Sequence, residues 1–274
     1  MSDDHFDGED DGLEPWRGGP LLESSPATEI TPPSKKNARR AAAVSKSAKK
    51  DASIVGGFAF YLSLAALLPT GVLTVLLAVV TWEHSSAIPT GIFVTSALVG
   101  AFLAHSCVSG HISVLIHEFK HSVVSNLVGN KRKGMKVNER SGHFEYSYTK
   151  RTAHYNAFIS LAPYILPLFT FICSLLAFAL VRHNHERAAI VVGIGYGCDL
   201  LLNARDISPI QTDISLIRGG YKVGLLYIGA WNLVILGLLL AWVFKGTAGF
   251  VMLLEQFSLF FVKVHLYLSA RTLE

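Results

Sequence analysis

Apolar residues in this 274-residue chain come in long blocks separated by short polar stretches. A helix needs about 20 consecutive apolar residues to cross the hydrocarbon core of a bilayer, and several blocks reach that length. Only 16% of the residues are charged, whereas soluble domains usually have about 25%. The sequence therefore predicts an all-α polytopic membrane protein with about five or six transmembrane helices. The blocks cover approximately residues 54–82, 89–128, 155–181, 187–203, 223–244 and 247–268.

Two of these blocks allow more than one arrangement. The block at 89–128 is too long for one ordinary span. The preferred interpretation is one span whose helix continues beyond the hydrocarbon edge, and the alternative is a re-entrant segment followed by a second helix. The block at 247–268 contains Glu255, Lys263 and His265, so it is either a transmembrane span or an interfacial helix.

The first 52 residues differ from the rest of the chain. An acidic segment is followed by a basic stretch between Lys35 and Lys50, and large apolar residues are few. Such a segment buries too little apolar area to offset the entropy of ordering, so we expect a disordered tail. Its cations directly precede the first span, which places the N-terminus in the cytoplasm. We therefore expect three parts: a tail over 1–52, a transmembrane core over 53–246 and a C-terminal helix over 247–274.

A small β-structure is expected between the second and third blocks. A basic loop at 130–134 is followed by alternating residues over 135–150, with Phe144, Tyr146 and Tyr148 on one side. Ser141 and Gly142 lie between the two halves. This pattern is typical of a β-hairpin.

The candidate chemistry begins at His117-Glu118-Phe119-Lys120-His121. Positions four apart differ by roughly 40° around a helix and share one face, so the two imidazoles can bind one zinc ion. Zinc lowers the pKa of a water molecule to about 7, and Glu118 can take its proton and deliver it to the leaving amine. The flanking residues are apolar, and ionisable side chains in such a helix are costly unless they have a function. A metal site is therefore favoured over chance occurrence.

A catalytic zinc site has a third protein ligand. The polar loop at 203–213 offers two carboxylates, Asp206 and Asp213. Asp206 adjoins Arg205 and is readily explained as its ion-pair partner. Asp213 opens a new stretch, where the dipole of a helix favours a carboxylate. We favour Asp213 as the third ligand and keep Asp206 as the alternative.

The predicted topology brings these residues to one face of the membrane. With the N-terminus inside, the first span leads out and the second returns, which places Lys131, Arg132 and Lys133 in the cytoplasm, as the positive-inside rule requires. The blocks at 155–181 and 187–203 then lead out and back. The paired histidines and the loop after residue 205 are therefore expected near the same face.

Further polar and small residues lie within the fourth block. Asp199 is either a supporting partner of the metal site or a hydrogen-bonding group within the helix bundle. Gly193 and Gly197, four residues apart, are typical of closely packed membrane helices.

The order of these motifs resembles the site-2 protease family of intramembrane zinc metalloproteases. The shared features are a membrane-embedded H-E-x-x-H, a β-rich loop, two spans and a loop with Asn, Pro and Asp, and the stretch at 159–167 is also similar. The resemblance covers about residues 90–245. Two residues depart from the family pattern: Lys120 stands where the family often has Gly, and Ile214 follows Asp213 where an Asp-Gly pair is frequent.

The resemblance implies one zinc ion per chain and cleavage of transmembrane segments of other proteins within the bilayer. It implies His117, His121 and a loop aspartate as zinc ligands and Glu118 as the catalytic base. Asn203 and Pro209 would be the residues that shape the loop.

The sequence as a whole thus favours a membrane-embedded zinc endopeptidase that acts on membrane-protein substrates. The hairpin edge from Phe144 to Tyr148 can pair with an unwound substrate, or the hairpin can simply cover the protein. An inactive relative with a binding or regulatory role is the first alternative, but Glu118 argues against it. An ion or solute transporter is the second, but the ionisable residues cluster at one membrane face. The net charge of +4 is too small to indicate nucleic-acid binding, and no pattern indicates an oligomeric state.

Overall fold

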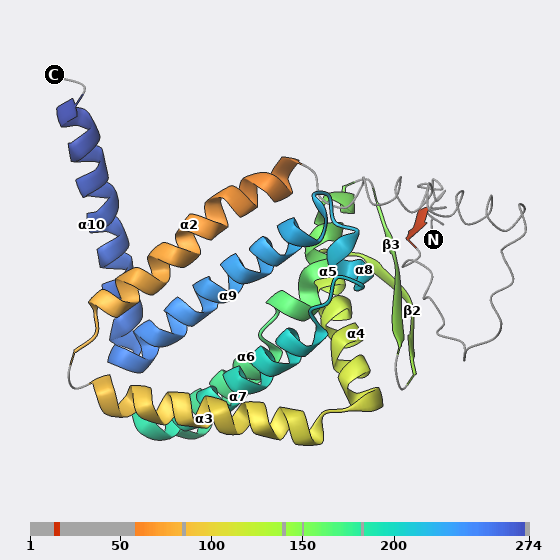
Figure 1. The fold of residues 1–274 in the computed structure, drawn as a ribbon, viewed down its shortest axis with the longest axis horizontal. Coiled ribbons are helices and arrows are strands. Elements are labelled where there is room, and N and C mark those ends of the chain that lie inside the picture. Colours follow the sequence, from red (N-terminus) through yellow and green to blue (C-terminus); the bar gives the residue numbers. More distant parts are fainter. Residues whose placement is uncertain are drawn as a thin grey trace, which may run out of the picture. The chain divides into compact units, whose positions relative to one another are not determined.

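The computed structural model describes residues 14–16, 58–83, 86–138, 141–149, 151–181 and 184–271. The described chain is mostly helical and carries one small antiparallel sheet (Figure 1). Five helices are long and apolar enough to cross a membrane, and the pair α5 (Asn156–Ile165) and α6 (Leu168–Val181) makes a sixth if counted as one broken span. The predicted polytopic fold is confirmed. The five helices are α2 (Phe58–Val80), α3 (Ala87–Cys107), α7 (His185–Asp206), α9 (Gly220–Lys245) and α10 (Thr247–Arg271).

The long block at 89–128 forms two helices, so our preferred interpretation of one continuous helix is wrong. α3 ends at Cys107, and α4 runs from Gly110 to Leu127. Gly110 has a φ of +51°, a backbone conformation that interrupts an α-helix and that glycine adopts at little cost. Of these two helices, only α3 has the length and apolarity of a transmembrane span. The second helix of the alternative interpretation is therefore present.

The terminal segments bear on two further predictions. α10 has 25 residues and meets the criteria of length and apolarity for a span. The predicted disordered tail over 1–52 lies outside the described residues, except for the short strand β1 (Glu14–Trp16).

The predicted hairpin is present as β2 (Lys131–Val137) and β3 (Gly142–Tyr148). β3 is the central strand of a three-stranded antiparallel sheet in the order β1-β3-β2, with Met135 opposite Phe144. Our prediction of a loop at 130–134 is wrong for residues 131–134, which belong to β2. β2 is an edge strand with exposed cations, so it lacks the apolar alternation that marks a strand in sequence.

The chain divides into two compact units. The first contains residues 1–60, 110–163 and 209–221, and thus α4, the sheet and most of α5. Its core is formed by Phe144, Tyr146 and Ile159, with Val124 and Val128 of α4 packed against them. The Tyr146 hydroxyl donates to Asn156 Oδ1 at 3.2 Å. β3 is therefore fixed to both α4 and α5.

The second unit contains residues 61–109, 164–208 and 222–274, and small residues allow close contacts between its helices. The backbone of α3 approaches α7 directly at Gly193 and Gly197, where an added Cβ would overlap the carbonyls of Phe93 and Ala97. The predicted close packing at these glycines is confirmed.

Asp199 of α7 accepts hydrogen bonds from Thr170 N at 2.8 Å and from Thr170 Oγ1 at 2.9 Å. Thr170 lies in the first turn of α6, whose N-terminal N–H groups have no acceptor within their own helix. Of the two interpretations predicted for Asp199, the structure therefore shows the hydrogen-bonding group within the helix bundle.

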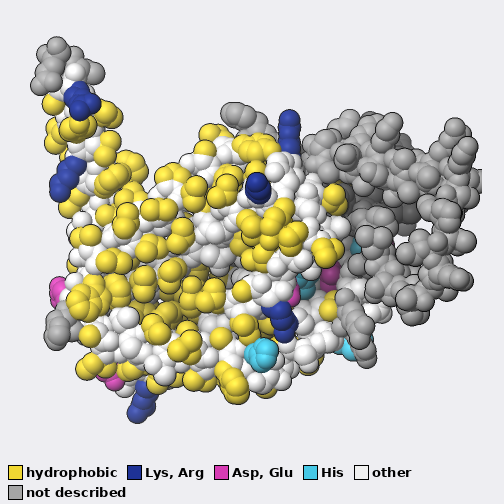
Figure 2. Space-filling view, viewed as in Figure 1, with side chains coloured by type: hydrophobic (Ala, Val, Ile, Leu, Met, Phe, Trp, Pro, Cys, Tyr) yellow, Lys and Arg dark blue, Asp and Glu magenta, His cyan; other side chains and the backbone are white. Residues whose placement is uncertain are grey.

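Large apolar side chains remain on the outside of the second unit. Figure 2 shows hydrophobic side chains spread over α2, α9 and α10. Leu98, Phe102 and Leu180 are 69%, 68% and 78% exposed. Exposed apolar area on this scale is costly in water, and a surrounding bilayer removes that cost.

Candidate metal centre

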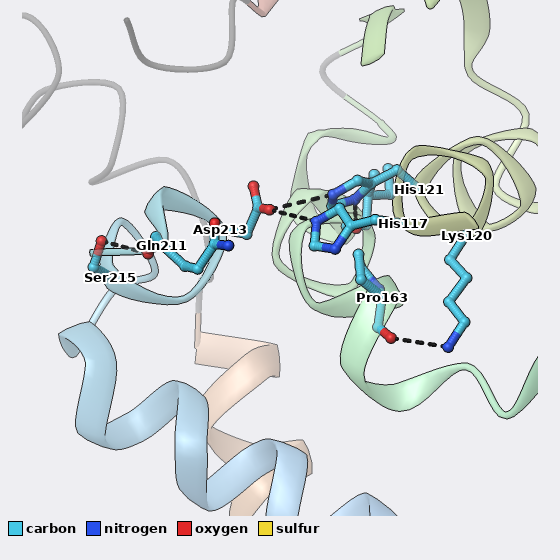
Figure 3. A network of polar contacts seen from close by, with 8 residues as sticks. His117, Lys120, His121, Pro163, Gln211, Asp213 and Ser215 are labelled. Carbon is cyan, nitrogen blue, oxygen red and sulfur yellow. Dashed lines mark hydrogen bonds and ion pairs between the residues drawn. The ribbon is translucent and has the colours of Figure 1, made fainter. Parts of the chain in front are cut away.

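One face of α4 carries two imidazoles directed at the same place. His117 and His121 lie one turn apart, with ring centroids 5.1 Å from each other and planes inclined by 70°. Their spacing of four residues gives them a common helix face. Both side chains point toward Asp213 of the short helix α8 (Thr212–Ser215), as Figure 3 shows.

Asp213 is the third member of this group. Its Oδ2 lies 3.2 Å from His117 Nε2 and 3.3 Å from His121 Nε2, and the ligand atoms of all three residues lie within 4.8 Å of one another. Among the described residues, no other three His, Cys, Asp or Glu side chains gather in this way. Burial alone would raise the pKa of Asp213, but the imidazoles of His121 and His117 hold it below its ordinary value.

The donor set fits a zinc ion. Two imidazole nitrogens and one carboxylate oxygen are ligands that zinc accepts, and a tetrahedral ion with bonds of about 2.0–2.2 Å separates its ligand atoms by about 3.4 Å. The observed separations between Asp213 and the imidazoles are 3.2 and 3.3 Å. Three protein ligands leave one position for water or substrate, which is the arrangement of catalytic zinc sites.

Local structure explains why Asp213 can reach the imidazoles. After α7 the chain turns at Pro209, and α8 begins after Gln211. The Ser215 hydroxyl donates to Gln211 O at 2.8 Å, which holds the turn closed (Figure 3). Ile214 is fully buried, so its side chain anchors α8 while the neighbouring Asp213 faces the imidazoles.

The other loop residues singled out by sequence lie elsewhere. Asp206 ends α7 beside Arg205, with Oδ1 3.8 Å from Arg205 Nε. Asn203, in the last turns of α7, is buried and donates from Nδ2 to Tyr164 O at 3.1 Å. Between the two predicted alternatives, it is Asp213 that the structure brings to the histidines.

Two contacts between α4 and α5 were not predicted from the sequence. Ile159 O is 2.6 Å from His121 Nδ1. Because a carbonyl only accepts, Nδ1 carries the hydrogen, which leaves the lone pair of Nε2 for a metal. Lys120 is 1% exposed and donates from Nζ to Pro163 O at 3.1 Å.

Glu118 lies on α4 between the histidines and is buried, with 7% of its surface exposed. Gly142, at the start of β3, lies directly against it: a Cβ at Gly142 would overlap the Glu118 carboxylate and Val114. Burial raises the pKa of Glu118, although the imidazoles of His121 and His117 act in the opposite direction. A carboxylate with an increased proton affinity is suited to accept a proton and release it again.

Comparison with known proteins agrees with this geometry. Residues 92–270 match the family described as Peptidase M50B-like, a stretch that includes α4, the hairpin and α8. No curated protein and no solved structure gives a significant match. The family match covers more than half of the chain and confirms the resemblance to site-2 proteases. The chain is a multi-pass membrane protein that belongs to the Peptidase M50B-like family.

Proposed function

We propose that this protein is a zinc-dependent endopeptidase that cleaves membrane proteins in or near their transmembrane segments. The observation that carries the proposal is the gathering of His117, His121 and Asp213 beside Glu118. The family match supports peptidase chemistry. The candidate spans support a reaction at the membrane.

Each residue of the centre has a part in hydrolysis. His117 Nε2, His121 Nε2 and an Asp213 oxygen would hold zinc. When bound, zinc would act as a Lewis acid that activates water and polarises the scissile carbonyl. The Glu118 carboxylate accepts the proton of the attacking water and then passes it to the leaving amine nitrogen. Burial of Glu118 keeps this proton away from bulk solvent.

The sheet supports a way to present the substrate. β1 pairs with β3 only at Tyr146, Ser147 and Tyr148. On that side, the part of β3 from Gly142 to Glu145 has no strand partner among the described residues. Gly142 contacts Glu118, so an extended substrate that adds to this edge would run toward the catalytic carboxylate. Strand addition uses main-chain hydrogen bonds and therefore tolerates varied side chains.

The distribution of charge supports a cytoplasmic location for the centre. Basic residues precede α2 and recur in β2 at Lys131, Arg132, Lys133 and Lys136, and cations favour the cytoplasmic side of membrane proteins. We place the N-terminus and the metal centre on that side.

The experiment is cleavage of a model transmembrane substrate by purified protein reconstituted in lipid vesicles. Wild-type protein should cleave, lose activity with a zinc chelator and regain it when zinc is added back. Glu118→Gln should bind zinc but cleave at least about a hundredfold more slowly, since general acid–base catalysis contributes about 10²–10⁴-fold. Zinc-loaded wild type and Glu118→Gln that cleave equally slowly would support a binding or regulatory role instead.

A further inference from the structure

Two prolines four residues apart, Pro163 inside α5 and Pro167 just beyond its end, bear on the hydrogen bonding of this helix. In an α-helix each carbonyl accepts from the N–H four residues later, and proline has no N–H. Pro163 therefore leaves Ile159 O without its helical donor. Pro163 O is one of the last four carbonyls of α5, which ends at Ile165, so it also has no donor within the helix. Pro167, just beyond that end, has no N–H to offer it. The sequence thus exposes two carbonyls, one turn apart, on the same face of α5.

Neighbouring side chains of α4 occupy both carbonyls. His121 Nδ1 lies 2.6 Å from Ile159 O, and Lys120 Nζ lies 3.1 Å from Pro163 O (Figure 3). Lys120 is 1% exposed and His121 7%. A buried carbonyl or ammonium without a partner is costly, so each contact satisfies groups that would otherwise destabilise the packing of α4 on α5.

We propose that Pro163, Pro167 and Lys120 are positioning residues of the metal centre. Pro163 makes Ile159 O available to orient His121, and Pro167, just beyond the end of α5, offers no N–H that could compete with Lys120 for Pro163 O. With Nδ1 bonded to the backbone, His121 Nε2 faces Asp213 at 3.3 Å. This inference rests on the proposed zinc site, and it assigns a role to residues that do not contact the metal.

The role explains why position 120 carries a lysine. Its four-carbon stem reaches the α5 carbonyl, and its ammonium is a charged donor near the C-terminal end of α5, where the helix dipole favours a cation. A glycine at this position has no side chain that could form the bond. Lys120 thus supplies a second contact between α4 and α5, next to the one that orients His121, which a glycine could not form.

The first test is Pro163→Ala in the full-length protein, with zinc affinity measured by competition with a chromophoric chelator. Alanine restores an N–H that competes for Ile159 O. Loss of a hydrogen bond that orients a metal ligand typically weakens binding about 10–100-fold, so we expect a zinc Kd at least about tenfold higher. The Tm of the metal-free protein should be unchanged or higher, because alanine favours the helix. An unchanged Kd would overturn the proposal.

The second test is a double-mutant cycle on the other contact. Lys120→Met leaves Pro163 O without the ammonium and should raise the zinc Kd about tenfold. Adding Pro167→Ala provides an N–H that donates to that carbonyl when α5 extends by a further half turn, so the double variant should bind zinc more tightly than Lys120→Met alone. If the effects of the two substitutions on the free energy of zinc binding simply add, the proposed coupling between Lys120 and Pro167 is contradicted.

The control is Pro69→Ala, which alters a proline inside α2 and should leave the zinc Kd at the wild-type value. These binding measurements are independent of proteolysis. Wild type that binds zinc without cleaving any substrate would refute the proposed peptidase activity, while the Kd values would still decide the role of the three residues.

Discussion

The Glu118 carboxylate lies against the α-carbon of Gly142, and this contact joins the hairpin to the centre of the site. The approach depends on the absence of a side chain at Gly142, since a Cβ there would overlap both Glu118 and Val114. The hairpin therefore contributes to the burial of Glu118. At this scale one methyl group is enough to change the position of the proposed catalytic base.

We predict that Gly142→Ala lowers peptidase activity while zinc remains bound. The new methyl group must displace Glu118 or the strand, and overpacking of this kind typically costs about 1–3 kcal/mol. Activity should fall at least about tenfold, which corresponds to 1.4 kcal/mol. The measurement is the cleavage rate of a model substrate together with the zinc content of the same sample.

Gly134→Ala in β2 is the matched control, because a Cβ at Gly134 meets no atom within 4 Å. It should retain wild-type cleavage. Equal activity of the two variants would show that the close approach of Gly142 to Glu118 is unimportant for the reaction.

The residues with the proposed chemistry could be identified from sequence because their types and spacing are informative. A spacing of four residues brings His117 and His121 together on α4. The partners of these residues were harder to predict, since Ile159 contributes only its backbone carbonyl. The missing N–H of Pro163 was a usable signal for that carbonyl, but the choice of donor depends on how α4 packs on α5.

At the scale of the elements, α3 and α7 pack closely against each other in the second unit. Gly193 and Gly197 of α7 face the backbone of α3, and Gly100 of α3 faces Ile194 of α7. Without bulky side chains the two backbones approach closely, as is common between membrane helices. This packing fixes α7, the helix that leads to the loop bearing Asp213.

We predict that Gly197→Ala destabilises the protein by forcing α3 and α7 apart. The added Cβ would overlap Ala97 O, and overpacking costs about 1–3 kcal/mol. Thermal unfolding in detergent should show a lower Tm than wild type.

The control is Gly91→Ala in α3, where a Cβ would meet no atom within 4 Å. Alanine is favoured over glycine in a helix by about 1 kcal/mol, so its Tm should equal or exceed that of wild type. A Tm for Gly197→Ala as high as that of Gly91→Ala would contradict the packing argument.

The elements that sequence predicted well are those with a strong apolar or alternating pattern. The six blocks and the second strand of the hairpin were found in this way. Two features were missed for identifiable reasons. The break at Gly110 interrupts an apolar run in which glycine is otherwise tolerated, and β2 is an edge strand whose charges conceal its extended conformation.

The arrangement of the whole molecule in the membrane follows from counting spans. With α5 and α6 as one broken span, the described residues contain six candidate crossings. The proposed cytoplasmic N-terminus would then place β2 and α8 on the cytoplasmic side and the segment after α2 on the opposite side. Six crossings would also return the end of α10 to the cytoplasm.

We predict the corresponding pattern of cysteine labelling in sealed, right-side-out vesicles from a background without native cysteines. Lys133→Cys in β2 and Arg271→Cys at the end of α10 should react with an impermeant reagent only after the membrane is permeabilised. Glu83→Cys, after α2, should react in intact vesicles. Labelling of Lys133→Cys in intact vesicles would contradict the proposed orientation, and labelling of Arg271→Cys there would show that α10 does not complete a sixth crossing.

The central claim is that His117, His121 and Asp213 together bind one zinc ion. Its most direct test is the zinc content of purified wild-type protein and of the variants Asp213→Asn and Asp206→Asn, measured by elemental mass spectrometry. We predict about one zinc ion per chain in wild type and in Asp206→Asn, and a large loss in Asp213→Asn, whose Oδ2 lies 3.2 Å from His117 Nε2 in the wild-type structure. Zinc retained by Asp213→Asn but lost from Asp206→Asn, or no zinc in the wild type, would contradict this assignment.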